Sequence, residues 1–225
     1  MTLEEKDMAN VVDTPVLYGA RYSVYTRIPR LALEEKGVSY RLEEVDIFAP
    51  SGPPAVYAER QPFGRIPAFE HDGFRLYESG AISRYVDEAF SGPALQPPDA
   101  KGRARVNQII SICDSYAYRT LVWDIFVERV SVPTQGKPSD EARIAAALPR
   151  AATCLRVLDT CLAGQPWLAG PSLSLADLHA QPMLALFRLA PEGAELLAKH
   201  TALSCWWEAM AGRPSVQATR SPREQ

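Results

Sequence analysis

The spacing of hydrophobic positions changes near residue 92 of this 225-residue chain. Before that point, short apolar runs alternate with turn residues, as in short strands and helices. Beyond it, apolar residues recur at the three- and four-residue spacing of amphipathic helices. We therefore predict a mixed α/β domain at 1–90, a linker rich in proline and glycine at 91–102, and an all-helical domain at 103–225.

The first domain is predicted to run strand, helix, strand, short helix, hairpin, helix. Turn residues and apolar alternation place these elements at 15–19, 23–37, 39–47, 55–60, 66–79 with Asp72-Gly73 at the hairpin turn, and 79–90. Ser23 is the expected N-cap of the first helix, and Gly37 its stop. Pro29 conflicts with this helix because proline lacks the backbone donor, so we expect a late start or a kink there.

The second domain is predicted to consist of helices at 103–131, 139–163, 174–190 and 194–211. Ser174 followed by Asp177 forms a capping-box pattern at the start of the third of these helices, which indicates a structural role. The last residues, "ATRSPREQ", are expected to form a frayed tail.

Charge and hydropathy limit the possible partners. The net charge of −3 argues against nucleic acid or an anionic membrane as a main partner. No apolar run approaches 18 residues, so no membrane-spanning helix is expected. The first dozen residues are acidic and have no continuous apolar core, so we predict no secretory signal.

The cysteine and histidine spacing indicates no metal site. The four cysteines form no C-x-x-C pair, and we expect them to be free thiols in a reducing cytoplasm. They are Cys113, Cys154, Cys161 and Cys205. The three histidines are His71, His179 and His200. They share no metal-ligand spacing with one another or with the cysteines.

The stretch "FGRIPAFEHDGFRLYESGAI" carries the most informative chemistry. Pro67 precedes a strand, which is typical of a strand-entry proline. Glu78 and Ser79 stand where the hairpin ends and a helix begins. They are either an ordinary helix cap or an anion site, where free backbone N–H groups and a hydroxyl receive a carboxylate. Beside such an anion site, Glu78 suits a ligand that also carries an ammonium group.

From Pro15 to about Pro214, the chain resembles the cytosolic glutathione S-transferases. The resemblance is carried by "SVYTRIPRLALEEKG", "PFGRIPAFEHDGFRLYESGAI" and "LAGPSLSLADL", in this order and separation. It implies a thioredoxin-like α/β N-terminal domain that binds glutathione, an all-α C-terminal helical bundle, a cytoplasmic location and a homodimer. It also implies that Pro67 is cis, that Ile66 pairs with the cysteinyl backbone of glutathione, and that Glu78 and Ser79 hold the γ-glutamyl end.

Several hydroxyls near the first helix compete to activate the glutathione thiol. "SVYTR" resembles the pattern of the serine-using, phi-like and bacterial type, and this favours Ser23 as the catalytic residue. Tyr18 and Tyr22 remain alternatives, since other classes of the family use a tyrosine. We expect Tyr22, Tyr25 and Tyr116 to line the pocket of the second substrate, a small hydrophobic electrophile.

The chain departs from serine-using relatives at the glycyl end of glutathione. Arg65 stands where glutamine is usual, and "SGPP" replaces a loop that usually carries a lysine or histidine. Arg65 is therefore expected to take the glycyl carboxylate, as a bidentate partner. We predict a glutathione S-transferase. The alternatives are a non-catalytic relative that binds other proteins, and a glutathione-dependent isomerase or lyase.

Overall fold

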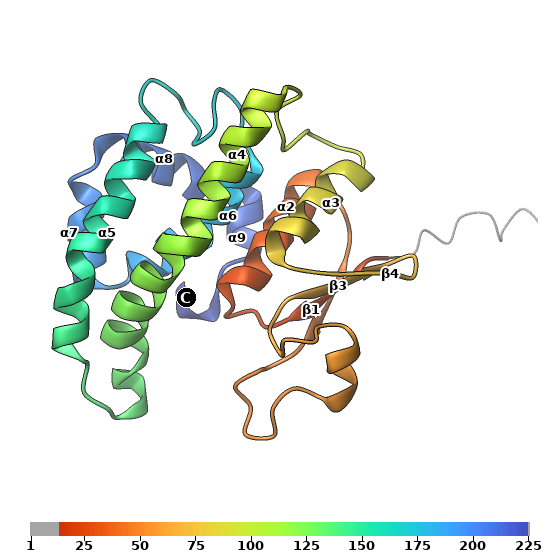
Figure 1. The fold of residues 1–225 in the computed structure, drawn as a ribbon, viewed down its shortest axis with the longest axis horizontal. Helices are drawn as coiled ribbons and strands as arrows, with labels where there is room; N and C mark the ends of the chain where they lie inside the picture. The colour runs from red at the N-terminus through yellow and green to blue at the C-terminus, as the bar shows by residue number, and fades with distance from the viewer. Residues whose placement is uncertain (1–13, 225) are drawn as a thin grey trace, which may run out of the picture.

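The computed structural model describes residues 14–224 and consists of a small α/β domain packed against a helical domain (Figure 1). The prediction of no secretory signal in the first dozen residues lies outside the described residues. Within them, no helix is both long and apolar enough to cross a membrane.

The α/β domain is built on a four-stranded mixed sheet in the order β2-β1-β3-β4. β1 (Val16–Gly19) pairs in parallel with β2 (Arg41–Glu44) and antiparallel with β3 (Ala68–His71), which forms a hairpin with β4 (Phe74–Tyr77). A short 3₁₀ helix, η1 (Ala55–Glu59), connects the two halves. The predicted order of strands, helices and hairpin is confirmed.

Helix α2 (Val24–Lys36) begins and ends where the sequence predicts, with Ser23 as N-cap and Gly37 in the left-handed region at φ 68°. It begins at Val24 and runs through Pro29, so of the two alternatives expected at this proline, a late start or a kink, the late start is wrong. Pro29 cannot donate to the carbonyl of Tyr25 one turn earlier. That carbonyl instead accepts a hydrogen bond of 2.8 Å from the Ser79 hydroxyl at the start of α3 (Ser79–Ala89).

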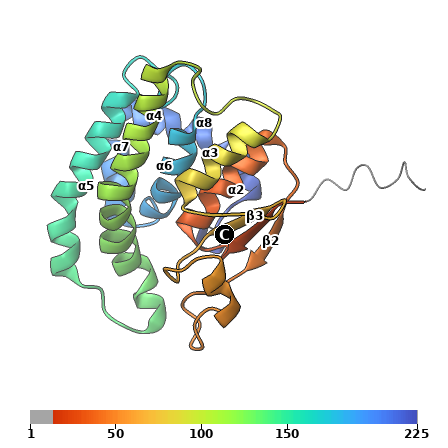
Figure 2. The same ribbon diagram turned by 45° about the vertical axis from the view of Figure 1, so that its right-hand side comes forward.

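The turn between β1 and α2 depends on Gly19. A Cβ at this position would lie 2.3 Å from Oγ1 of Thr26, a fully buried side chain in the first turn of the helix. Glycine therefore permits the close approach of strand and helix that presents Ser23. Helices α2 and α3 lie between the sheet and the helical domain (Figure 2).

The helical domain starts with α4 (Ala100–Ile112), which continues directly into η2 (Cys113–Ser131), a helix with i→i+5 hydrogen bonding. The following elements are η3 (Pro133–Gln135), α5 (Glu141–Cys161), α6 (Leu175–Phe187), α7 (Pro191–Ala198), α8 (Thr201–Ala211), α9 (Pro214–Ala218) and η4 (Pro222–Glu224). The helix predicted at 194–211 is in fact two, α7 and α8, which are separated at Lys199 and His200.

Helix α6 is buried along its whole length at the centre of the helical domain. Its capping box is present. The buried Asp177 carboxylate accepts from the backbone and hydroxyl of Ser174 at 2.9 and 2.8 Å, from the backbone of Leu168, and from the indole of Trp206. This confirms the structural role of the motif.

The C-terminal residues do not fray as predicted, because they pack against α2 of the first domain. Arg27 is 2% exposed and donates to Thr219, to the carbonyl of Val216 and to Glu224. A buried guanidinium needs such partners to offset its desolvation. The prediction failed because no local pattern in the tail indicates a partner 192 residues earlier in the chain.

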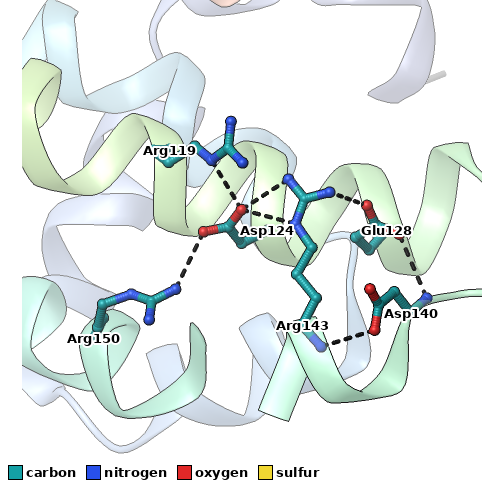
Figure 3. A network of polar contacts seen from close by, with 6 residues as sticks. All are labelled: Arg119, Asp124, Glu128, Asp140, Arg143 and Arg150. Carbon is teal, nitrogen blue, oxygen red and sulfur yellow. Dashed lines mark hydrogen bonds and ion pairs between the residues drawn. The ribbon is translucent and has the colours of Figure 1, made fainter. Parts of the chain in front are cut away.

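A polar network ties η2 to α5 within the helical domain (Figure 3). Asp124 is buried and is contacted by Arg119 from its own helix and by Arg143 and Arg150 from α5. Arg143 also pairs with Glu128. The arginines compensate the buried carboxylate, so the network fixes the helix that forms one wall of the cavity described next.

Candidate active site

A cavity of about 1150 Å³ opens between the two domains. From the first domain it is lined by the start of α2, the loop after β2, the loop before β3 and the start of α3. From the second it is lined by one face of η2, with α6 and the C-terminal segment. The predicted site residues that share this cavity are Tyr22, Ser23, Tyr25, Arg65, Ile66, Pro67, Glu78 and Ser79.

Ser23 lies half-buried at the N-terminus of α2, with the extended backbone of an N-cap. Its Oγ accepts a hydrogen bond of 3.2 Å from the Thr26 backbone. The capping role uses only a lone pair of the oxygen, so the hydroxyl proton remains able to donate to an anion in the cavity. The free N–H groups and the dipole of the helix also favour negative charge at this position.

The two tyrosines that compete with Ser23 are engaged elsewhere. Tyr22 donates to Asp46 at 2.6 Å, and burial together with this carboxylate raises the pKa of Tyr22. Tyr18 does not line the cavity; its ring lies 4.6 Å from the guanidinium carbon of Arg60, beside Tyr57. The geometry therefore favours Ser23 as the hydroxyl whose proton is available.

The loop before β3 brings Arg65, Ile66 and Pro67 to the cavity. The Ile66–Pro67 peptide bond is cis, as the resemblance implies. The carbonyl of Arg65 accepts from the hydroxyl of Tyr57 at 2.8 Å, while its side chain is exposed. Burial raises the pKa of Tyr118 on the helical wall, and the positive charge of Arg65, which lines the same cavity, acts to lower it.

The start of α3 combines a strained backbone with an exposed acid. Glu78 is the N-cap residue at φ 72° and ψ 115°, and its side chain makes no capping bond. Such a conformation is unfavourable for a residue with a Cβ and is found at ligand sites, where the surrounding structure maintains it. Because the Ser79 hydroxyl donates to Tyr25, an anion at this helix end would be received by backbone N–H groups.

Tyr25 and Tyr116, which we expected together in the second-substrate pocket, lie in different places. Tyr25 lines the cavity and contacts Tyr118, with ring centroids 4.5 Å apart. Tyr116 is 64% exposed and lies outside the cavity, so its expected position is wrong. The reason is helical geometry: Asp114 and Tyr118 face the cavity, and a residue two positions from each points away from that face.

The sequence analysis missed several residues of the helical wall. Asp114 lines the cavity and its Oδ1 lies 2.7 Å from Nε2 of His179, a buried side chain on α6. The spacing Asp114, Tyr118, Val122, Phe126 predicts one helix face and would have identified this wall. Arg223 also lines the cavity, and no sequence signal indicates that the C-terminal segment returns to the site.

Comparison with known proteins connects this cavity to a family. Residues 17–94 match the family description "Glutathione S-transferase, N-terminal domain", and residues 116–214 match "Glutathione S-transferase, C-terminal domain". Glutathione S-transferase F14 of Arabidopsis thaliana is 30% identical over 188 residues, which are 81% of this chain and 74% of the relative.

Solved structures give the same result. Glutathione transferase F7 from Populus trichocarpa superposes with a TM-score of 0.82 at 29% identity, covering 92% of this chain and 97% of the poplar chain. Glutathione S-transferase I from maize, in complex with an atrazine glutathione conjugate, superposes with a TM-score of 0.81 at 28% identity, covering 92% of this chain and 96% of the maize chain.

Proposed function

Because the chain belongs to the glutathione S-transferase family, we propose that Ser23 activates glutathione by donating its hydroxyl proton to the glutathione thiolate. A thiol with a pKa near 8.5 is only about 3% ionised at pH 7. A hydrogen bond and the N-terminus of α2 stabilise the thiolate and lower that pKa by about two units. The observation that carries the proposal is the hydrogen bond from the Thr26 backbone to Ser23 Oγ at the cavity. Because the hydroxyl accepts in this bond, its own proton can be donated to the thiolate.

Glutathione would bind with its γ-glutamyl end at the start of α3. The Glu78 side chain takes the ammonium group, and the backbone N–H groups at Ser79 and Gly80 take the α-carboxylate. The Ile66 backbone pairs with the cysteinyl part, and Arg65 takes the glycyl carboxylate. The strained backbone of Glu78 and the presence of all these residues on one cavity support this placement.

The chemical step is attack by the thiolate sulfur on an electrophilic carbon. In a substitution, the new sulfur–carbon bond forms as the leaving group departs with the electron pair of its bond. The second substrate occupies the part of the cavity along the helical wall beside Tyr25, with Tyr22 near the mouth. Apolar side chains line this part of the wall, from Val122, Trp123, Phe126 and Leu186.

The non-catalytic alternative is not favoured, since the relatives are named as transferases. Within residues 14–224, no group of three or more His, Cys, Asp or Glu side chains is placed to hold a metal ion. The described cysteines are all free thiols, which supports a cytoplasmic location. We further propose that the protein is a homodimer, because the first domain exposes the aromatic ring of Phe63 at 69%, in contact with exposed Tyr77.

A binding experiment tests the placement of glutathione. We expect isothermal titration to detect glutathione binding, and Glu78→Gln to weaken it by about tenfold, because a charge-assisted hydrogen bond contributes about 1.5–3 kcal/mol. A glutathione analogue that lacks the γ-glutamyl amine should bind both proteins equally. No binding of glutathione at millimolar concentration, or equal losses for both ligands, would contradict the placement.

A further inference from the structure

Asp114 is a carboxylate held in a fixed position on the helical wall of the cavity. Its side chain is 43% exposed, whereas that of His179 is 1% exposed. A carboxylate only accepts hydrogen bonds, so His179 carries its proton on Nε2 and donates it to Oδ1 at 2.7 Å. This bond and a hydrogen bond from the Tyr25 hydroxyl use two of about four acceptor positions on the carboxylate. The partly exposed side chain still offers the other positions to a ligand or to solvent.

Aromatic rings surround this carboxylate. Tyr25 on α2 lies in edge contact with His179, with centroids 6.3 Å apart, and packs against Tyr118. Trp123 and Phe126 continue the same wall. A negative charge beside aromatic rings is the combination that binds positively charged groups, because the ring faces attract cations and the carboxylate supplies the full countercharge.

The proposed position of glutathione leaves Asp114 without a role in binding that substrate. Glu78 serves the ammonium group of glutathione at the start of α3, while Asp114 belongs to the opposite wall, on η2. An electrophile that is wholly apolar would displace solvent from this carboxylate and leave its charge with only the hydrogen bonds from His179 and Tyr25, which is costly. The negative charge of Asp114 therefore weakens the binding of neutral second substrates and strengthens the binding of cationic ones.

We propose that Asp114, positioned by His179, is a specificity-determining residue that selects second substrates carrying a positively charged group near the electrophilic carbon. The inference rests on the proposed function, since it concerns the second substrate of the same reaction. Arg65 and Arg223 also line the cavity. If the positive charges of these two arginines dominated the second pocket, the enzyme would instead prefer anionic electrophiles.

The test uses three benzyl chlorides that differ only in the para substituent: trimethylammonium, tert-butyl and carboxylate. The first two have nearly the same shape and differ in charge. The value of kcat/KM is measured for each compound with glutathione in excess. It is then divided by the rate of the uncatalysed reaction of the same compound with glutathione, to correct for differences in intrinsic reactivity among the compounds. We expect Asp114→Asn to lower the ratio of the trimethylammonium to the tert-butyl value by about fivefold, as for a partly exposed ion pair with a free energy of about 1 kcal/mol.

Control variants separate charge recognition from general damage to the cavity. Glu59→Gln removes the same charge from an exposed side chain of the first domain outside the cavity and should leave the ratio unchanged. His179→Gln keeps a donor near the position of Nε2 and should keep the ratio, whereas His179→Leu removes the donor and should lower the ratio. Circular dichroism melting identifies any variant that fails to fold.

The outcomes also separate this inference from the proposed function. If wild type conjugates the tert-butyl compound but Asp114→Asn leaves the ratio unchanged, or if wild type prefers the carboxylate compound, the specificity role of Asp114 is wrong and the transferase proposal stands. An equal change of the ratio in Glu59→Gln also contradicts it. If no benzyl chloride is conjugated although glutathione binds, the proposed chemical step fails.

Discussion

At the residue scale, the site depends on a hydrogen bond that replaces the backbone bond that a proline cannot donate. Pro29 leaves the Tyr25 carbonyl without its donor in α2, and the Ser79 hydroxyl supplies one from α3 at 2.8 Å. Ser79 is 5% exposed, so water does not readily take its place. The proline in the first helix thereby fixes the distance between the two helix N-termini that receive glutathione in our proposal.

A double-mutant cycle tests this coupling. Ser79→Ala should lower the free energy of unfolding by about 1–2 kcal/mol, because it leaves the Tyr25 carbonyl unsatisfied. In a Pro29→Ala background, the backbone N–H restored by the substitution donates to that carbonyl, and the same change should cost about 1 kcal/mol less. Urea unfolding of the four proteins measures the coupling energy; additive effects would show that Ser79 does not replace the missing donor.

The sequence predicts which residue types gather at the site, but not how each hydroxyl is engaged. Ser23, Glu78 and Pro67 follow from local patterns and from the family resemblance. That Tyr22 is bound to Asp46, 24 residues away, depends on tertiary structure. The same is true of the cation–aromatic contact of Tyr18 with Arg60. Ranking the hydroxyls therefore needed the fold.

At the scale of elements, α2 connects the two domains through charged side chains. Besides Arg27, its Glu35 accepts from Arg213 at 2.7 Å and from the hydroxyl of Ser215. The long helices and the hairpin were predictable because their apolar periodicity and turn residues are local. The docking of α9 and η4 was not, because it depends on buried charges that meet across the whole length of the chain.

The Glu35 contact predicts a pH dependence of stability. Burial alone would raise the pKa of Glu35, but the bonds from Arg213 and Ser215 outweigh it and lower this pKa in the folded state. The stabilisation is therefore present above the unfolded pKa of about 4.3 and is lost as the pH falls through the folded value.

We expect Glu35→Gln to cost about 1–3 kcal/mol of unfolding free energy at pH 7 and clearly less near pH 3.5. Urea titrations of both proteins across this range measure the difference. Glu208→Gln, an exposed acid on α8, is the control for overall charge. A deficit that is the same at both pH values would contradict the role of the ionised Glu35.

At the scale of the whole molecule, the proposed homodimer should depend on Phe63. Its ring is 69% exposed and contacts Tyr77 at 6.0 Å between centroids. Exposed aromatic residues of this kind are typical of interface hot spots, which contribute about 2 kcal/mol or more. Phe63→Ser should weaken dimerisation by about thirtyfold or more, as measured by sedimentation equilibrium.

Phe48→Ser provides a matched control for the dimer. Phe48 is 63% exposed and, like Phe63, lines the cavity, but its ring packs against Tyr22 and against Trp123 of the helical domain of its own chain. We expect this change to leave the dimer intact. A wild-type protein that is monomeric at all concentrations, or equal effects of the two substitutions, would refute the assignment of Phe63 to the interface.

The most direct test of the account is the pKa of the glutathione thiol bound to the enzyme, with and without the Ser23 hydroxyl. Ultraviolet absorbance of the thiolate, followed against pH with saturating glutathione, measures this pKa. We predict a value about two units below that of free glutathione in the wild type. In Ser23→Ala it should return most of the way to the free value, while glutathione still binds. An unchanged pKa in Ser23→Ala would contradict the central claim and would assign the activating group to another residue.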